Sequence, residues 1–258
     1  MPVTPMDLPD GTPEDVRVRA ASAPRVPVSD PALGRDVQVD ARGVPPHRLV
    51  AIGDSVLQGF QSGAVFHTDV SVPAIVAYEL GWLRRFRYPR YAGPGGLPLN
   101  IELLLRDLER RFGSSVNVWE TPLALFAVRA LMDEVEDYWE RGPGRDAPLP
   151  ATYRHNLSCF GWDLRDALSK TAATCEAAIA TPKDDLLDQI VQNNGERAAL
   201  RVYPRWSDEA KSMTVFDAAA ALGDDHDDTT EAGIETLVVF LGSNNALGTV
   251  TDLRISWS

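Results

Sequence analysis

The sequence predicts an α/β fold in which a parallel sheet carries helices between its strands. Two short, largely apolar runs, residues 49–52 and 236–241, have the length and composition of buried strands. A third run, residues 153–161, ends at a glycine and is also expected to be a strand. Segments with helical spacing of apolar residues separate these runs. Strands alternating with helices are typical of an open α/β sheet, whose site lies at the carboxyl ends of the strands.

Four helices are predicted between the strands. Ser71 and a proline in the first turn can begin the first helix, and Gly81 can end it. Asp163 can cap the last helix, with Asp166 at the third helical position. The predicted helices cover residues 71–80, 101–112, 124–138 and 164–179.

The composition is that of a globular protein in water. Of 258 residues, 44% are hydrophobic and 24% are charged, which is ordinary for this class. The net charge of −12 disfavours nucleic acid and anionic membrane surfaces as partners, because like charges repel. We find neither a secretory signal nor an apolar run long enough to cross a bilayer. The expected location is therefore the cytoplasm.

The cysteines and the Pro-rich start of the chain give two further expectations. Cys159 and Cys175 have no cysteine or histidine at zinc-finger spacing, so we expect no structural metal and two reduced, semi-buried thiols. Residues 1–46 show little periodicity and are predicted to form an extended or loosely packed leader. Residues 47–258 are predicted to form one domain with an insertion around residues 84–152.

Each predicted strand ends in residues that could form part of a catalytic site. The first ends in Gly53-Asp54-Ser55, where Gly53 allows a sharp turn and Gly59 allows close backbone approach four residues after the serine. The second ends at Gly161, and the third ends in Gly242-Ser243-Asn244. Because the carboxyl ends of parallel strands share one edge of a sheet, these residues are expected to meet there.

These three blocks resemble the SGNH, or GDSL-type, hydrolase family. Gly53-Asp54-Ser55 with Gly59, Asn156-Leu157 with Gly161, and Gly242-Ser243-Asn244 match the first three sequence blocks of that family in order. The resemblance covers roughly residues 48–250. It implies a three-layer α/β/α, flavodoxin-like fold and a serine esterase or lipase-like hydrolase that acts on a small-molecule ester through an acyl-enzyme, without a cofactor.

The resemblance also implies roles for individual residues. Ser55 is the expected nucleophile, and its own N–H would join the N–H of Gly161 and the amide of Asn244 in an oxyanion hole. Many family members have aspartate after the third-block asparagine, whereas this chain has Asn245. The supporting residues implied by the resemblance are Gly53, Asp54, Gly59, Gly242 and Asn245.

The general base that the resemblance requires is not found. It implies a histidine after the third block, with aspartate three residues before it, but His47, His67, His155 and His226 all precede that block. Without a base, a serine is a poor nucleophile. We favour a hydrolase whose last strands, helix and Asp-x-x-His block lie beyond residue 258. The alternatives are an unrecognised base, or an inactive binding protein for an acyl or glycan ligand or a protein partner.

Structural explanations compete with the catalytic ones at each position. Ser55 can simply cap a helix, and Gly161 and Asn244 can simply form turns. Asp54 is expected to organise the turn through hydrogen bonds rather than to transfer protons. His155 is expected to be packed or hydrogen-bonded, and His226 to lie in a solvated acidic loop. A nucleotide-binding protein is disfavoured, since no phosphate-binding glycine-rich loop follows the first strand.

Overall fold

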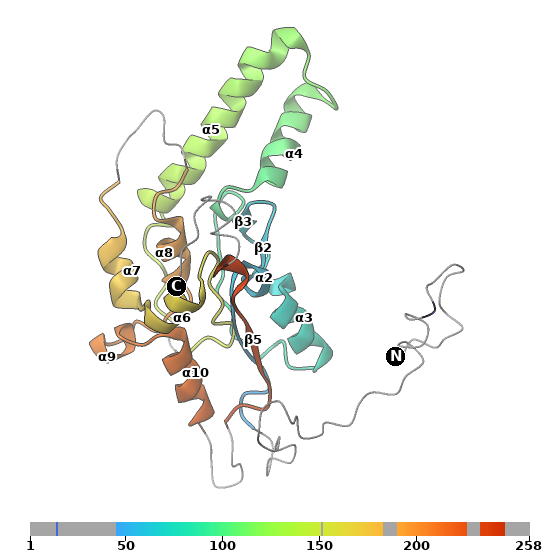
Figure 1. The fold of residues 1–258 in the computed structure, drawn as a ribbon. Coiled ribbons are helices and arrows are strands. Elements are labelled where there is room, and N and C mark those ends of the chain that lie inside the picture. Colours follow the sequence, from blue (N-terminus) through green and yellow to red (C-terminus); the bar gives the residue numbers. More distant parts are fainter. Residues whose placement is uncertain (1–13, 15–44, 151, 183–189, 226–232, 246–258) are drawn as a thin grey trace. The chain divides into compact units, whose positions relative to one another are not determined.

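The computed structural model describes residues 14, 45–150, 152–182, 190–225 and 233–245 (Figure 1). The chain divides into two units, residues 1–41 and 42–258, and all the described residues except residue 14 belong to the second. The predicted leader therefore lies outside the described residues, apart from its last two positions and residue 14. No helix among the described residues is long and apolar enough to span a bilayer.

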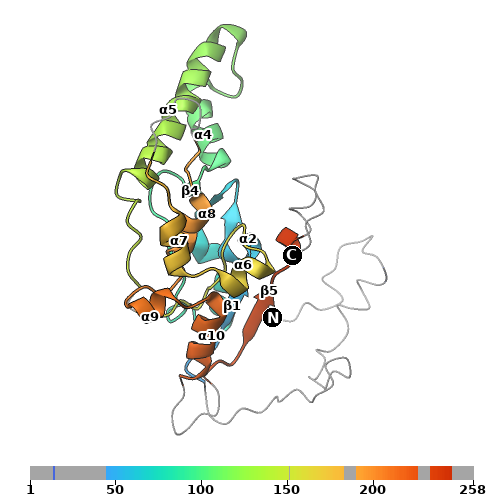
Figure 2. The same cartoon turned by 60° about the vertical axis from the view of Figure 1, so that its left-hand side comes forward.

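The second unit is a mixed α/β structure built around strand β1 (Val50–Gly53). β1 pairs in parallel with β5 (Leu237–Phe240), in a register that sets Val50 opposite Leu237 and Gly53 opposite Phe240. β1 is completely buried, as its apolar run predicts. Two strands that lie far apart in the sequence therefore end side by side (Figure 2). The residues that directly follow each strand lie at the same edge of the sheet.

The third predicted strand is an extended segment along the other side of β1. Asn156 forms a parallel bridge with Ala51, whose N–H donates to the carbonyl of His155 at 2.8 Å. Farther along, the N–H of Cys159 donates to the carbonyl of Gly53 at 2.9 Å. β1 is thus flanked by β5 and by residues 155–159. Within the described residues this is a two-stranded parallel sheet with one accompanying segment, smaller than the sheet of a flavodoxin-like fold.

A second, antiparallel sheet and a set of helices complete the described residues. The antiparallel sheet contains β2 (Phe60–Gln61), β3 (Ala64–Val65) and β4 (Leu97–Pro98). The α-helices are α2 (Ser55–Gln58), α3 (Val72–Glu79), α4 (Ile101–Phe112), α5 (Thr121–Glu140), α6 (Leu164–Ser169), α7 (Ala172–Ala178), α8 (Asn194–Ala199), α9 (Asp208–Lys211) and α10 (Val215–Gly223). Short 3-10 helices, η3 (Thr68–Val70) and η4 (Val118–Glu120), precede α3 and α5.

The helix predictions are confirmed at three of the four positions. α3, α4 and α5 cover the predicted segments, and Asp163 caps α6 in a capping box with Asp166. The helix predicted over residues 164–179 is instead two helices, α6 and α7. The chain becomes extended at Lys170, and the Thr171 side chain accepts from the N–H of Thr174 to start α7. Sequence periodicity did not reveal this break because apolar residues continue across it.

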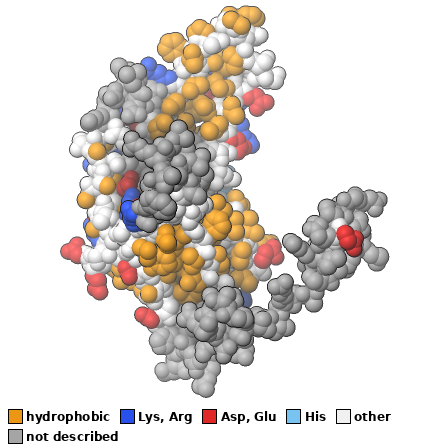
Figure 3. Space-filling model, in the orientation of Figure 1, with side chains coloured by type: hydrophobic (Ala, Val, Ile, Leu, Met, Phe, Trp, Pro, Cys, Tyr) orange, Lys and Arg blue, Asp and Glu red, His pale blue; other side chains and the backbone are white. Residues whose placement is uncertain are grey.

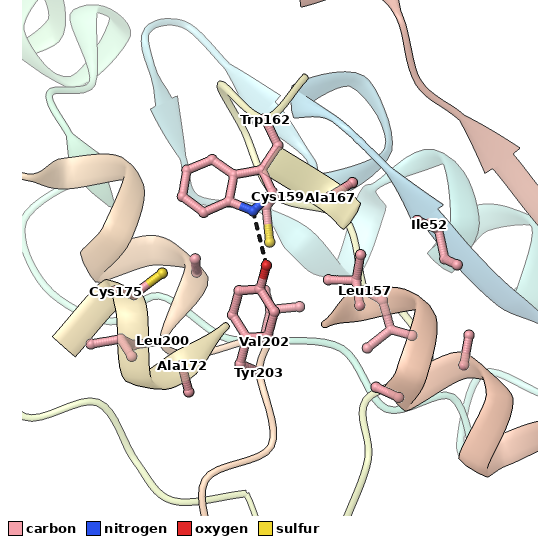
Figure 4. Close-up of a cluster of buried hydrophobic side chains, with 14 of the residues drawn as sticks. Ile52, Leu157, Cys159, Trp162, Ala167, Ala172, Cys175, Leu200, Val202 and Tyr203 are labelled. Carbon is pink, nitrogen blue, oxygen red and sulfur yellow. Dashed lines mark hydrogen bonds between the residues drawn. The ribbon is translucent and has the colours of Figure 1, made fainter. Parts of the chain in front are cut away.

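Among the described residues, the largest hydrophobic cluster lies between β1, the extended segment 155–159 and helices α6, α7, α8 and α10 (Figure 4). Trp162 is buried in it and donates from its indole nitrogen to the hydroxyl of Tyr203 at 3.0 Å. Cys159 and Cys175 are free thiols, as predicted, but they are fully buried rather than semi-buried. Burial raises the pKa of the Cys175 thiol to about 12, so this thiol stays protonated and unreactive at neutral pH.

The expectation that residues 236–241 form a buried strand is correct for the strand and wrong for its burial. The side chains of β5 are 36–52% exposed. Within the described residues, β5 packs mainly against β1, which covers one edge of the strand and leaves its faces open. Hydrophobic side chains consequently gather on the face of the molecule over β5 (Figure 3).

Gly53→Ala is expected to lower the free energy of unfolding by about 1–3 kcal/mol. A Cβ at this position would lie 2.8 Å from Leu57 Cδ1 and 2.9 Å from the carbonyl oxygen of Phe240. Chemical denaturation measures the effect. Gly223→Ala is the matched control, since its Cβ would first meet Ile234 at 3.9 Å. Equal stability of the two variants would contradict the close packing of β1, β5 and α2.

Candidate active site

The three sequence blocks converge at the carboxyl ends of β1 and β5. Ser243, after β5, donates a short hydrogen bond from its hydroxyl to the carboxylate of Asp54, after β1. Asn244 donates from its side-chain amide to the carbonyl of Trp162 at 2.7 Å, next to Gly161. Asn245 accepts from the N–H of Leu164 at 3.2 Å. Each block therefore contacts another through side chains, in addition to the pairing along β1.

Ser55 is the first residue of α2 and follows directly on the buried Asp54. The carboxylate of Asp54 accepts from the N–H of Val56 at 3.0 Å and from the hydroxyl of Ser243, so Asp54 organises the turn as predicted. Gly59 ends this single helical turn with a φ of +96°, and its N–H donates to the carbonyl of Ser55. Ser55 itself is half-buried. Neither its hydroxyl nor its N–H bonds to any described residue.

The other two predicted oxyanion donors also keep an unused N–H. Gly161 is exposed, and its N–H has no partner within residues 45–150, 152–182, 190–225 and 233–245. Its φ of +80° favours glycine, and a Cβ there would meet nothing within 4 Å. The amide of Asn244 uses one N–H for Trp162 and retains the second. Three N–H donors are therefore available on the three converging blocks.

Two buried side-chain amides, to which the sequence analysis gave no role, hold the blocks together. Gln58 is fully buried, accepts from the N–H of Phe160 at 2.6 Å, and donates to the hydroxyl of Tyr91 at 2.8 Å. Asn156 donates to the carbonyl of Leu57 at 2.9 Å. Both tie the first block to the segment that precedes Gly161. A buried amide is costly without a partner. The position of Gln58 on the buried side of α2 was therefore the signal that could have indicated its structural role.

None of the histidines in the described part of the chain bonds to Ser55. His47 and His155 lie near the amino end of β1, away from Ser55. His67 is exposed and lies 3.8 Å from Asp69, measured from Nδ1 to a carboxylate oxygen. His226 lies outside the described residues.

His47 and His155 belong to a buried hydrogen-bonded chain. The N–H of Arg87 donates to Nδ1 of His155 at 2.8 Å, which leaves Nε2 of His155 to donate to Nδ1 of His47 at 3.0 Å. Nε2 of His47 then donates to the carboxylate of Asp225 at 2.8 Å. This order assigns the tautomer of both rings and confirms that His155 is a packed, hydrogen-bonded histidine. Burial, with the nearby charge of Arg87, lowers the pKa of His155 to about 2.

Acid is expected to destabilise the protein through His155. The unfolded chain binds a proton on this ring below about pH 6.5, whereas the folded state does not bind it until about pH 2. The contribution of His155 to the free energy of unfolding is therefore fully present above about pH 6.5. It falls by about 1.4 kcal/mol per pH unit as the pH drops from there toward 2. Imidazole NMR of the folded protein tests this. An ordinary titration of His155 would contradict it.

Comparison with known proteins adds no identification. No protein family matches the chain, and neither a curated protein nor a solved structure matches it. Among the described residues, no group of three or more His, Cys, Asp or Glu side chains could hold a metal ion.

Proposed function

We propose that this protein is a serine acyl hydrolase of the SGNH type that cleaves a small-molecule ester through an acyl-enzyme on Ser55. The observation that supports this most directly is the convergence of Ser55, Gly161 and Asn244 at one edge, each with an N–H that no described residue uses. A capping serine or a turn asparagine alone would not require the other two blocks to meet it. Preorganised donors around a serine hydroxyl suit a reaction that develops negative charge on a carbonyl oxygen.

The chemistry proceeds in two acyl transfers. Ser55 Oγ attacks the ester carbonyl, and its proton passes to the general base. The N–H groups of Ser55, Gly161 and Asn244 stabilise the oxyanion. The carbon–oxygen bond to the alcohol then breaks, and the base returns the proton to the leaving alcohol. Water repeats the attack on the acyl-enzyme, releasing the carboxylic acid and restoring Ser55.

The general base lies outside the described residues in this proposal. His47 and His155 are engaged in their own hydrogen-bonded chain, and His67, which lies beside Asp69, makes no hydrogen bond with Ser55. The open side chains of β5 support a larger sheet of the flavodoxin-like kind, in which further strands and helices cover this strand and bring the base.

The hydrolysis of p-nitrophenyl acetate and butyrate tests the proposal. We expect turnover by the protein expressed from its full reading frame and almost none by residues 1–258 alone. A base carried by a longer chain accounts for that difference. Normal turnover by residues 1–258 that depends on His47, His67, His155 or His226 would contradict the assignment of the base.

The alternative is a catalytically inactive protein of the same type that binds an acyl or glycan ligand or a protein partner. This alternative is favoured by the absence of any base beside the Ser55 hydroxyl among the described residues. A reading frame that stops after residue 258, together with no ester turnover, would support it over the hydrolase.

A further inference from the structure

The first part of α5, residues 121–132, is apolar and yet largely exposed. It contains a single charged residue, Arg129. A helix segment this apolar is normally packed inside a protein. Here it forms a hairpin with α4 (Figure 1), and hydrophobic side chains gather on the surface over α5 (Figure 3). The large exposed hydrophobic side chains of this segment and of η4 before it are Val118, Trp119, Leu123, Leu125 and Phe126.

These side chains cover a wide arc of the helix. Because each residue turns an α-helix by about 100°, Leu125, Phe126 and Leu123 span an arc of about 160°. The buried Ala124 and Ala127 lie outside this arc, on the covered side of α5. A helix that packs on one protein surface needs an apolar stripe of only about 100°. A fluid layer, in contrast, can cover the whole arc.

The second part of α5 is strongly acidic. Residues 133–140 include no basic residue and five acidic ones, Asp133, Glu134, Glu136, Asp137 and Glu140. Two copies of the chain that paired in parallel along α5 would set these carboxylates against one another. An antiparallel pair would set them against the apolar part of the other copy. A second copy is therefore a poor partner for the apolar part.

The charges of the chain indicate which kind of lipid layer fits. Arg129 is exposed within the apolar arc, and its guanidinium makes no hydrogen bond or ion pair with any described residue. A guanidinium bonds well to a phosphate, such as that of a phospholipid headgroup. The acidic residues that follow, and the net charge of −12, oppose an anionic surface. A zwitterionic phospholipid offers the phosphate without a net negative charge.

We propose that η4 and the apolar part of α5 lie in the surface of a zwitterionic phospholipid layer. The apolar arc contacts the upper acyl chains, the indole of Trp119 lies at the interface, and Arg129 bonds to a headgroup phosphate. The α4–α5 hairpin packs on the antiparallel sheet through β4, so this surface is distinct from the open faces of β5. The proposal goes beyond ester hydrolysis at Ser55, and it stands whether or not that hydrolysis is observed.

Phosphatidylcholine vesicles with brominated acyl chains test the proposal, because bromine quenches an indole that lies beside it. We expect the 258-residue chain to sediment with these vesicles and to lose part of its tryptophan fluorescence. Trp119→Phe should sediment like the parent but lose little fluorescence, since Trp82, Trp139 and Trp162 are buried in the protein. No sedimentation with the vesicles, or equal quenching in Trp119→Phe, would overturn the proposal.

A double variant and a matched control locate the binding on α5. Leu125→Glu combined with Phe126→Glu is expected to weaken vesicle binding by about tenfold or more, since the charged side chains no longer gain from leaving water. Leu149→Glu is the control, because Leu149 lies outside the hairpin and is 68% exposed, against 70% for Phe126. It should bind like the parent. Unchanged binding by the double variant would contradict the proposal.

Two further measurements separate this proposal from its alternatives. Vesicles of anionic phosphatidylglycerol should bind the chain more weakly than phosphatidylcholine vesicles, and binding that required the anionic lipid would overturn the choice of a zwitterionic layer. Light scattering without lipid should show the same mass for the parent and the double variant. A parent dimer that the double variant dissociates would instead assign the surface to a second copy of the chain.

Discussion

Ser55→Ala is expected to lower kcat/KM for short aryl esters by about four orders of magnitude or more in the catalytically competent protein. The reason is that the acyl-enzyme cannot form without the hydroxyl, and the remaining N–H donors supply only residual catalysis. The variant should fold like the parent, because the Ser55 hydroxyl makes no hydrogen bond with a described residue. Steady-state hydrolysis of p-nitrophenyl butyrate measures the loss, and thermal unfolding checks the fold.

Ser114→Ala is the matched control for this measurement. Ser114 is exposed in the loop between α4 and α5 and belongs to none of the three blocks. Its substitution should leave kcat/KM and the unfolding temperature unchanged. If Ser55→Ala retained the activity of Ser114→Ala, Ser55 would not be the nucleophile; Asp54, and not Ser55, caps α2.

Asn244→Ala is expected to lower kcat by about a hundred- to a thousandfold, with little change in KM. The second N–H of its amide faces no described partner and is free to bond an oxyanion, a charge that develops mainly in the transition state. Loss of the hydrogen bond to Trp162 should cost about 1 kcal/mol of stability in addition. Parallel measurement of kcat, KM and unfolding separates these two effects.

Asn245→Asp serves as the comparison for Asn244→Ala. Its carboxylate would keep an acceptor for the N–H of Leu164, so activity should stay close to that of the parent. A loss confined to KM in Asn244→Ala, or an equal loss in Asn245→Asp, would contradict an oxyanion role for Asn244.

The parts of the fold that sequence reasoning predicts are those fixed by local chemistry. The capping box at Asp163 and the glycine after α3 are short-range signals, and the structure has both. The parallel pairing of β1 with β5 followed from two apolar runs that end in polar turns. Residues 155–159 lie along β1 as expected without forming a regular strand, because their pairing there is limited to one bridge and a few backbone hydrogen bonds.

The features that the sequence did not predict depend on distant partners. The hydrogen bond between His47 and Asp225 joins residues 178 positions apart, and nothing in the local pattern around either residue indicates it. The roles of Gln58 and the exposure of β5 likewise depend on what packs against them. For the candidate site, the sequence supplied the three blocks, and their mutual contacts through Asp54, Ser243 and Asn244 could come only from the structure.

The central claim is that Ser55 is a nucleophile within an assembled oxyanion hole. Its most direct test is labelling of the protein from the full reading frame with an aryl alkylphosphonate, followed by peptide mapping by mass spectrometry. The phosphorus is attacked by an activated serine, and the aryl oxide leaves. We predict one adduct, on Ser55, formed slowly in Asn244→Ala and absent in Ser55→Ala. An adduct on another residue, or no adduct in a protein that hydrolyses aryl esters, would contradict the claim.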